Sequence, residues 1–269
     1  MTGVSALLGI VAGFLMMMTG AILPNHTRLR DAIGTSLMAA GTRHVDRHRI
    51  PGGGRPVRAA GGDGVPMIDA AVCAGLCRDA YALPPDIAAG AARAIVRDVG
   101  DHRVIAFQGT HDAHQVVADL DVGPLRIPVI GAVHRGIWEA MLGIAVRADV
   151  AAAGRPLIII GHSLGGALAI ALAVHRTRLG KPPGAVVTFG APRIGIGPGC
   201  GAVLDATDVH CRLYRHGADV VPDLPPAVPL WEDWRHPAPL IQVGVPDDPV
   251  EDHAIARYCA ALGAPVTGS

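Results

Sequence analysis

Apolar and polar residues follow two different periods in the part of the chain after about Val65. Short, almost wholly apolar runs predict buried strands, and these lie at 103–110, 155–163, 184–193, 210–219 and 238–244. Longer stretches predict helices at 65–81, 84–100, 133–154, 164–180 and 249–263. Apolar strands that alternate with helices indicate an α/β fold with a mostly parallel central sheet and helices on both faces.

The first 24 residues have a different pattern. The stretch from Gly3 to Leu23 contains no charged residue and is followed by Pro24. About 20 apolar residues are enough to cross a bilayer as a helix. We therefore expect residues 1–24 to anchor the protein in a membrane. A cleaved signal segment, which would give a secreted or periplasmic protein, is the alternative, and a buried helix of a soluble protein is the third possibility.

Residues 25–64 are predicted to be a linker, because their second half is rich in Arg, Gly and Pro and has no hydrophobic period. The remaining residues, 65–269, are then the globular domain. Their number suits one α/β domain of ordinary size.

Composition narrows the classes of function. The chain has 23 basic and 23 acidic residues, so nothing indicates attraction to nucleic acid. Five cysteines are too few and too scattered for a disulfide framework. Cys73 and Cys77 are expected to be buried apolar side chains. Pairing of Cys200 with Cys211 stays open, since it depends on export from the cell.

The candidate chemistry begins at Gly161-His162-Ser163-Leu164-Gly165, which follows a predicted strand and opens a predicted helix. This is the Gly-x-Ser-x-Gly pattern of a nucleophile elbow. Glycines on either side relieve the crowding of a sharp turn, and the serine hydroxyl meets the positive end of a helix dipole. A glycine-rich turn with an incidental serine is the alternative. A nucleotide-binding loop is disfavoured because no Gly-Lys-Ser/Thr is present.

Chain order restricts the partners of Ser163. In this fold the acid follows the nucleophile and the histidine comes last. Asp219 lies just past a predicted strand end, with Asp223 as its rival. Only His236 and His253 come later, and His253 opens the terminal helix, from which an imidazole can reach back over the strand ends. We therefore predict a triad of Ser163, Asp219 and His253.

A tetrahedral intermediate also needs two hydrogen-bond donors for its oxyanion. The backbone N–H of Leu164 is the first, because it follows the nucleophile directly. Thr110, at the end of the earlier strand 103–110, is expected to contribute the second. The carboxyl ends of parallel strands meet at one edge of a sheet, which would bring these residues together.

Several ordered motifs resemble those of the class 3 lipases, which are fungal-lipase-like α/β hydrolases. They are VIAFQGT, VHRGIW, IIIGHSLGGALA, VVTFGAPRIG, ADVVPDLPP and EDHAIARY. The resemblance as a whole runs from about residue 67 to 258. The resemblance implies an α/β-hydrolase fold and serine esterase chemistry on acyl esters of lipids. It gives Ser163, Asp219 and His253 the catalytic roles and Thr110 with Leu164 the oxyanion hole. It implies no metal and no cofactor.

Two features depart from the family pattern. Gln108 stands where the family usually has arginine before the Gly-Thr of the oxyanion strand. The segment 111–133, where the family carries a lid, is only partly amphipathic and contains two prolines. Its start, His111 to His114, is expected to be a solvated loop and not a metal site.

These observations predict a carboxylic ester hydrolase acting on lipid esters such as acylglycerols, through an acyl-enzyme. A phospholipase, a small-ester esterase or an acyltransferase would use the same triad. A catalytically silent, membrane-tethered binding module is the non-enzymatic alternative. The expected partners are a lipid or small ester substrate and a membrane contacted by residues 3–23, without nucleic acid.

Overall fold

The computed structural model describes residues 68–110, 123–226 and 233–264. The predicted anchor and linker, residues 1–24 and 25–64, lie outside these ranges. So does the segment from His111 to His114. Within the described ranges no helix is both long and apolar enough to cross a membrane.

The centre of the described part is a seven-stranded sheet with the order β1-β2-β3-β6-β7-β9-β11. From β3 to β11 neighbouring strands are parallel, and β1 and β2 add an antiparallel edge. The strands are β1 Ile87–Ala89, β2 Ala92–Val99, β3 His102–Phe107, β6 Leu157–His162, β7 Ala185–Phe189, β9 His210–His216 and β11 Leu240–Val243. This mostly parallel sheet confirms the predicted fold class, and all five predicted strands lie in it.

The helix predicted at 84–100 is wrong, because this stretch forms the hairpin β1–β2. Its many alanines and arginines favour a helix locally. The chain instead turns at Gly90, which has a φ of +57°, and pairs β2 along the whole of β3. Pairing with a buried strand therefore outweighs the local helix preference.

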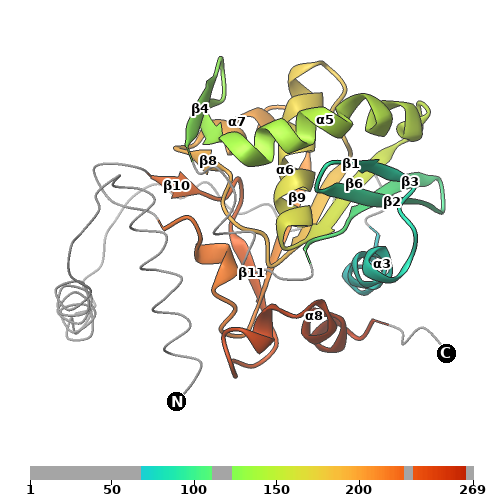
Figure 1. Ribbon diagram of the computed structural model, residues 1–269, viewed down its shortest axis with the longest axis vertical. Helices are drawn as coiled ribbons and strands as arrows, with labels where there is room; N and C mark the ends of the chain where they lie inside the picture. The colour runs from blue at the N-terminus through green and yellow to red at the C-terminus, as the bar shows by residue number, and fades with distance from the viewer. Residues whose placement is uncertain (1–67, 111–122, 227–232, 265–269) are drawn as a thin grey trace, which may run out of the picture. The chain divides into compact units, whose positions relative to one another are not determined.

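Helices cover both faces of the sheet (Figure 1). One face carries α5 Arg135–Ala152, α6 Leu164–Arg178 and the short α7 Gly199–Asp205, which share one hydrophobic core. The other face carries α3 Ala70–Ala82 and α8 Ile255–Leu262, which contact each other and enclose a second core. The predicted terminal helix is thus shorter than expected, since the 3₁₀ turn Glu251–His253 precedes α8.

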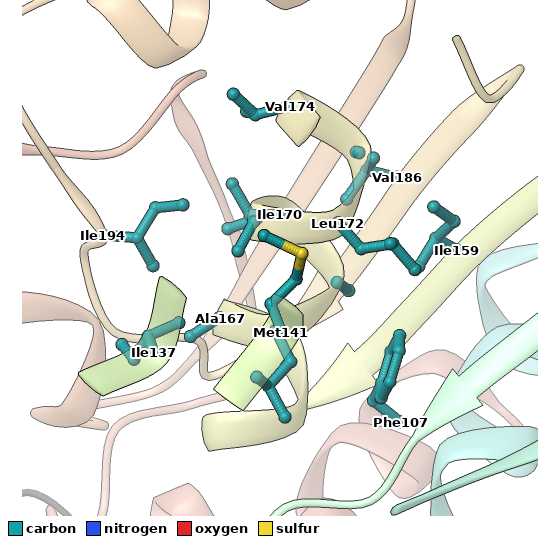
Figure 2. Close-up of a cluster of buried hydrophobic side chains, with 14 of the residues drawn as sticks. Phe107, Ile137, Met141, Ile159, Ala167, Ile170, Leu172, Val174, Val186 and Ile194 are labelled. Atoms are coloured by element: carbon teal, nitrogen blue, oxygen red, sulfur yellow. The ribbon is translucent and has the colours of Figure 1, made fainter. Parts of the chain in front are cut away.

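Helix α6 is apolar on all sides, as expected of a helix with no face toward water. Every residue from Leu164 to Val174 is buried. Figure 2 shows Ile170 and Leu172 of α6 in one cluster with Met141 of α5 and with Ile159 of the sheet. The sheet on one side and α5 on the other therefore fix the position of α6.

A small antiparallel sheet lies beside the main one, with the order β10-β8-β5-β4. Its strands are β4 Pro124–Ile127, β5 Gly131–His134, β8 Gly195–Ile196 and β10 Trp234–Arg235. No hydrophobic period predicts them, because each spans only two to four residues. The hairpin β4–β5 occupies most of the second half of the segment 111–133.

All five cysteines are free thiols. Cys73 and Cys77 are fully buried on α3, which confirms their prediction as apolar side chains. Cys200 and Cys211, whose pairing the sequence leaves open, form no disulfide.

Candidate active site

The turn between β6 and α6 has the backbone of a nucleophile elbow. Ser163 stands between the strand and the helix with φ +56° and ψ −130°, a conformation that non-glycine residues rarely adopt. A side chain at Gly161 would place its Cβ 2.2 Å from the carbonyl oxygen of Gly165. A Cβ at Gly165 would lie 2.4 Å from the carbonyl oxygen of Phe107. Both glycines are therefore sterically required, as the pattern predicts.

Main-chain hydrogen bonds hold Ser163 in this position. Its N–H donates to the carbonyl oxygen of Phe189 on the neighbouring strand β7, at 2.9 Å. Its own carbonyl accepts from Gly166 at 2.9 Å and from Ala167 at 3.2 Å, in the first turn of α6. The serine is thus fixed to the sheet on one side and to the helix on the other.

The structure brings the three predicted triad residues together. Nε2 of His253 lies 2.9 Å from Oγ of Ser163. Nδ1 of His253 lies 3.0 and 2.9 Å from the two carboxylate oxygens of Asp219. A carboxylate can only accept here, so Nδ1 carries the proton and Nε2 has a free lone pair directed at the serine hydroxyl. This is the arrangement in which an imidazole can remove a proton from a serine.

The Asp219 carboxylate is fully buried and has further donors. The N–H of Val221 donates to Oδ1 at 2.9 Å, and the hydroxyl of Tyr258 donates to Oδ2 at 2.6 Å. Burial and the neighbouring Asp219 charge raise the pKa of the Tyr258 phenol well above its ordinary value. The phenol therefore keeps its proton and remains a donor to the Asp219 carboxylate.

Gly190, after β7, leaves room for this cluster. Its φ is +61°, and a Cβ there would lie 2.7 Å from Oδ2 of Asp219 and 3.0 Å from Nδ1 of His253. The glycine in the strand-end motif TFGAPR thus leaves room for the side chains of Asp219 and His253 to meet.

Asp252 holds the segments of Asp219 and His253 together. Its Oδ2 accepts the N–H of Ala218, next to Asp219, at 2.8 Å, and the N–H of Asp247 at 2.9 Å. Its Oδ1 lies 3.2 Å from Nδ1 of His216. Because Asp252 is fully buried and directly precedes His253, its carboxylate links the two loops behind the triad.

The predicted oxyanion donors lie beside the elbow. A Cβ on Gly109 would lie 2.9 Å from Cβ of Ser163, so the loop that carries Thr110 rests against the nucleophile. The N–H of Gln108 donates to the carbonyl oxygen of Arg93 at 2.9 Å, which ties the loop to β2. Leu164 is the first residue of α6, where backbone N–H groups have no acceptor within the helix.

The rival residues from the sequence lie elsewhere. Nε2 of His236 donates to the carbonyl oxygen of Pro222 at 2.7 Å. The Asp223 carboxylate pairs with Arg193 at 3.2 Å and with Arg215 at 3.0 Å. In the described part of the chain, neither the His236 nor the Asp223 side chain forms a hydrogen bond or ion pair with Ser163. In the described ranges no three His, Cys, Asp or Glu side chains form a group that could hold a metal ion.

The sequence interpretation did not single out Tyr258, Asp252 or the residue pair Tyr81 and His162. Asp252 and Tyr258 both fall within the motif EDHAIARY around His253, and His162 precedes Ser163. Tyr81, at the end of α3, is far from any such motif. Only the folded chain shows that it reaches the site.

Residues 104–228 match the family described as Lipase (class 3). The secreted mono- and diacylglycerol lipase 1 of Fusarium solani is 31% identical over 145 residues, which are 51% of this chain and 42% of that protein. Lipase A of Sodiomyces alcalophilus is 38% identical over 84 residues, 27% of this chain and 20% of its own length. The chain thus spans less than half the length of these curated relatives.

Among solved structures, a lipase–propeptide complex of Rhizomucor miehei with a deletion is similar in fold. It aligns with a TM-score of 0.50 and 21% identity, over 64% of each chain. Together with the parallel sheet and the elbow between β6 and α6, this similarity confirms the predicted α/β-hydrolase fold.

Proposed function

We propose that this protein, whose residues 104–228 belong to the class 3 lipase family, is a serine hydrolase that cleaves carboxylic (acyl) esters. The observation that carries the proposal is the continuous hydrogen-bonded path from Asp219 through His253 to Ser163. Its members come from three separate segments, and each side chain is buried.

In the proposed mechanism Nε2 of His253 removes the proton from Ser163 as Oγ attacks the ester carbonyl. Asp219 keeps the proton of His253 on Nδ1 and stabilises the imidazolium that forms. The imidazolium then protonates the leaving alcohol, and an acyl-enzyme remains on Ser163. Water activated by the same imidazole attacks the acyl-enzyme and releases the carboxylic acid.

The negative charge of each tetrahedral intermediate is assigned to two donors, the backbone N–H of Leu164 and Thr110. Both lie at the end of the sheet where Ser163 stands, and the dipole of α6 adds a favourable field. Loss of one such donor typically costs about 3 kcal/mol of transition-state stabilisation. No metal or cofactor enters this mechanism.

We propose lipid esters such as acylglycerols as the substrates. The support is the family of residues 104–228 and the similarity to a protein described as a mono- and diacylglycerol lipase. That relative is described as secreted. For this chain we propose one of two arrangements. Either residues 1–24 are removed on export, or residues 3–23 anchor the chain in a membrane and a linker connects them to the domain 65–269.

The experiment compares the full chain with Ser163→Ala on p-nitrophenyl esters of increasing acyl chain length. Loss of almost all hydrolysis in Ser163→Ala is expected. Thr207→Ala is the control and should keep full activity, because Thr207 is an exposed residue just after α7 whose hydroxyl donates only to main-chain carbonyls of α7. A fluorophosphonate probe should label the wild type at Ser163 alone. Equal hydrolysis by wild type and Ser163→Ala would reject the assignment.

Substrates separate the related activities. A preference for long acyl chains supports a lipase, whereas activity confined to short chains indicates a small-ester esterase. Release of fatty acid from phosphatidylcholine indicates a phospholipase, and transfer to an added alcohol in preference to water indicates an acyltransferase. A folded chain that neither hydrolyses esters nor reacts with the probe would be a binding module.

A further inference from the structure

His162, the residue before Ser163, uses both nitrogens of its buried ring. Nε2 lies 2.7 Å from the carbonyl oxygen of His253, and Nδ1 lies 2.7 Å from the hydroxyl of Tyr81. A carbonyl can only accept, so Nε2 carries the proton and donates to His253. Nδ1 must then accept the hydroxyl proton of Tyr81. Two partners thus fix one tautomer of a ring that is 4% exposed.

The chain of hydrogen bonds continues beyond Tyr81. The backbone N–H of Gly109 donates to the phenol oxygen, and a Cβ on Gly109 would lie only 2.3 Å from that oxygen. Donors and acceptors therefore alternate without a break, from Gly109 to Tyr81 to His162, and from His162 to the backbone of His253. We call these four residues the strut.

The strut joins three segments whose relative positions the proposed reaction requires to be fixed. Gly109 precedes Thr110, His162 precedes Ser163, and the far end of the strut is the backbone of His253 itself. Reacting groups lose much of their advantage when they move by about 1 Å. The strut thus reaches from the loop of Gly109 to the backbone of His253.

The ring of His162 also lies against the ring of His253, with centroids 4.8 Å apart and planes at 33°. A positive charge at His162 would oppose the imidazolium that His253 becomes. Burial, with the neighbouring His253 as a smaller cause, lowers the pKa of His162 to about 3, although Asp219 acts in the other direction. The strut therefore stays neutral beside the base, and it holds His253 without competing for its proton.

Resting on the function proposed above, we propose that Tyr81 and His162 are positioning residues of the ester-hydrolysing site. They set the distance between the oxyanion loop and His253 through the backbones of Gly109 and His253. Neither side chain transfers a proton to the substrate. Because the strut aligns groups that act in the transition state, its loss should lower kcat and leave KM nearly unchanged.

The first test is Tyr81→Phe, which removes the hydroxyl and keeps the ring. We expect kcat per fluorophosphonate-titrated site to fall about tenfold, with KM within twofold of wild type. The control is Tyr214→Phe on β9, a buried tyrosine stacked on Phe189 outside the strut, which should keep kcat. Titration counts only assembled sites, so loss of folded protein does not imitate the effect. A kcat for Tyr81→Phe within twofold of wild type would overturn the proposal.

The second test combines Tyr81→Phe with His162→Gln in a double-mutant cycle. If both residues act through the Tyr81–His162 bond, the double variant should have the kcat of His162→Gln alone. Losses that multiply would contradict a common strut. Retained hydrolysis in Ser163→Ala would instead refute the proposed function, so the two failures are distinguishable.

Discussion

Ser163, the proposed nucleophile, is constrained in a different way from its proposed partners Asp219 and His253. At the elbow the constraint is steric, since Gly161 and Gly165 are pressed against backbone atoms and no larger residue fits. Around the acid and the base the constraint is polar. There the Asp252 carboxylate accepts hydrogen bonds from two backbone N–H groups, and the Tyr258 hydroxyl donates to Asp219.

This difference predicts which positions tolerate substitution and which do not. A steric constraint is absolute, because an added methyl group must displace backbone. A polar constraint is graded and depends on pH, because it rests on charge and on the strength of individual hydrogen bonds. The elbow should therefore fail with any larger residue, whereas the acid–base loops should weaken by steps.

Removal of the charge on Asp219 is expected to have the largest effect. In Asp219→Asn the amide can donate to Nδ1 of His253, so the ring proton moves to Nε2. A protonated Nε2 cannot accept the proton of Ser163. We expect kcat to fall about 10⁴-fold at neutral pH. Steady-state hydrolysis of a p-nitrophenyl ester measures it. Asp223→Asn, at a half-exposed carboxylate paired with Arg193 and Arg215, should stay within about twofold; the reverse ranking would assign the acid to Asp223.

Gly165→Ala tests the steric side of the comparison. Its Cβ would collide with the carbonyl oxygen of Phe107, so we expect a loss of about 3 kcal/mol in unfolding free energy together with most of the activity. The control is Gly75→Ala on α3, where the nearest atom to a new Cβ is 3.9 Å away. This exchange should stabilise the helix by about 0.5–1 kcal/mol. Urea unfolding measures both, and equal effects would contradict a steric elbow.

Asp252→Asn tests the polar side. Burial opposes the charge, but the N–H groups of Ala218 and Asp247 and the nearby His216 hold the pKa of Asp252 below its ordinary value. A lowered carboxyl pKa contributes stability above the unfolded-state value of about 3.9, and that stability is lost as the pH falls through the folded-state pKa. At pH 7 the variant should be about 2 kcal/mol less stable than wild type.

The difference between Asp252→Asn and wild type should shrink as the pH falls below about 4, because the wild-type carboxyl then protonates. Urea unfolding at a series of pH values measures it. Asp101→Asn, at an exposed aspartate, is the control at pH 7 and should leave the free energy of unfolding within about 0.5 kcal/mol of wild type. If the difference in unfolding free energy between Asp252→Asn and wild type stayed constant across this pH range, the charge of Asp252 would contribute nothing to stability.

The elbow could be predicted in full from the sequence because its requirements are local. Glycines two residues on either side of Ser163, a strand before and a helix after are all visible in one short stretch. Chain order then led to Asp219 and His253, which the structure places within hydrogen-bond distance of each other.

The remaining features depend on contacts between distant residues. The hairpin at 87–99 forms because β2 pairs with β3, against its own helical composition. Tyr81 lies 81 positions from its partner His162, and nothing near it in the chain marks it. The role of Asp252 follows from the approach of two loops, which no periodicity encodes.

The burial of α6 on all sides also limits the order in which the chain can fold during its synthesis. Its cover includes α5, made earlier in synthesis, and β7, made later, so no early fragment of the chain can enclose it. His253 emerges 90 residues after Ser163. A partly synthesised chain therefore contains Ser163 without His253, and the proposed catalytic pair can form only after the C-terminal segment has been made.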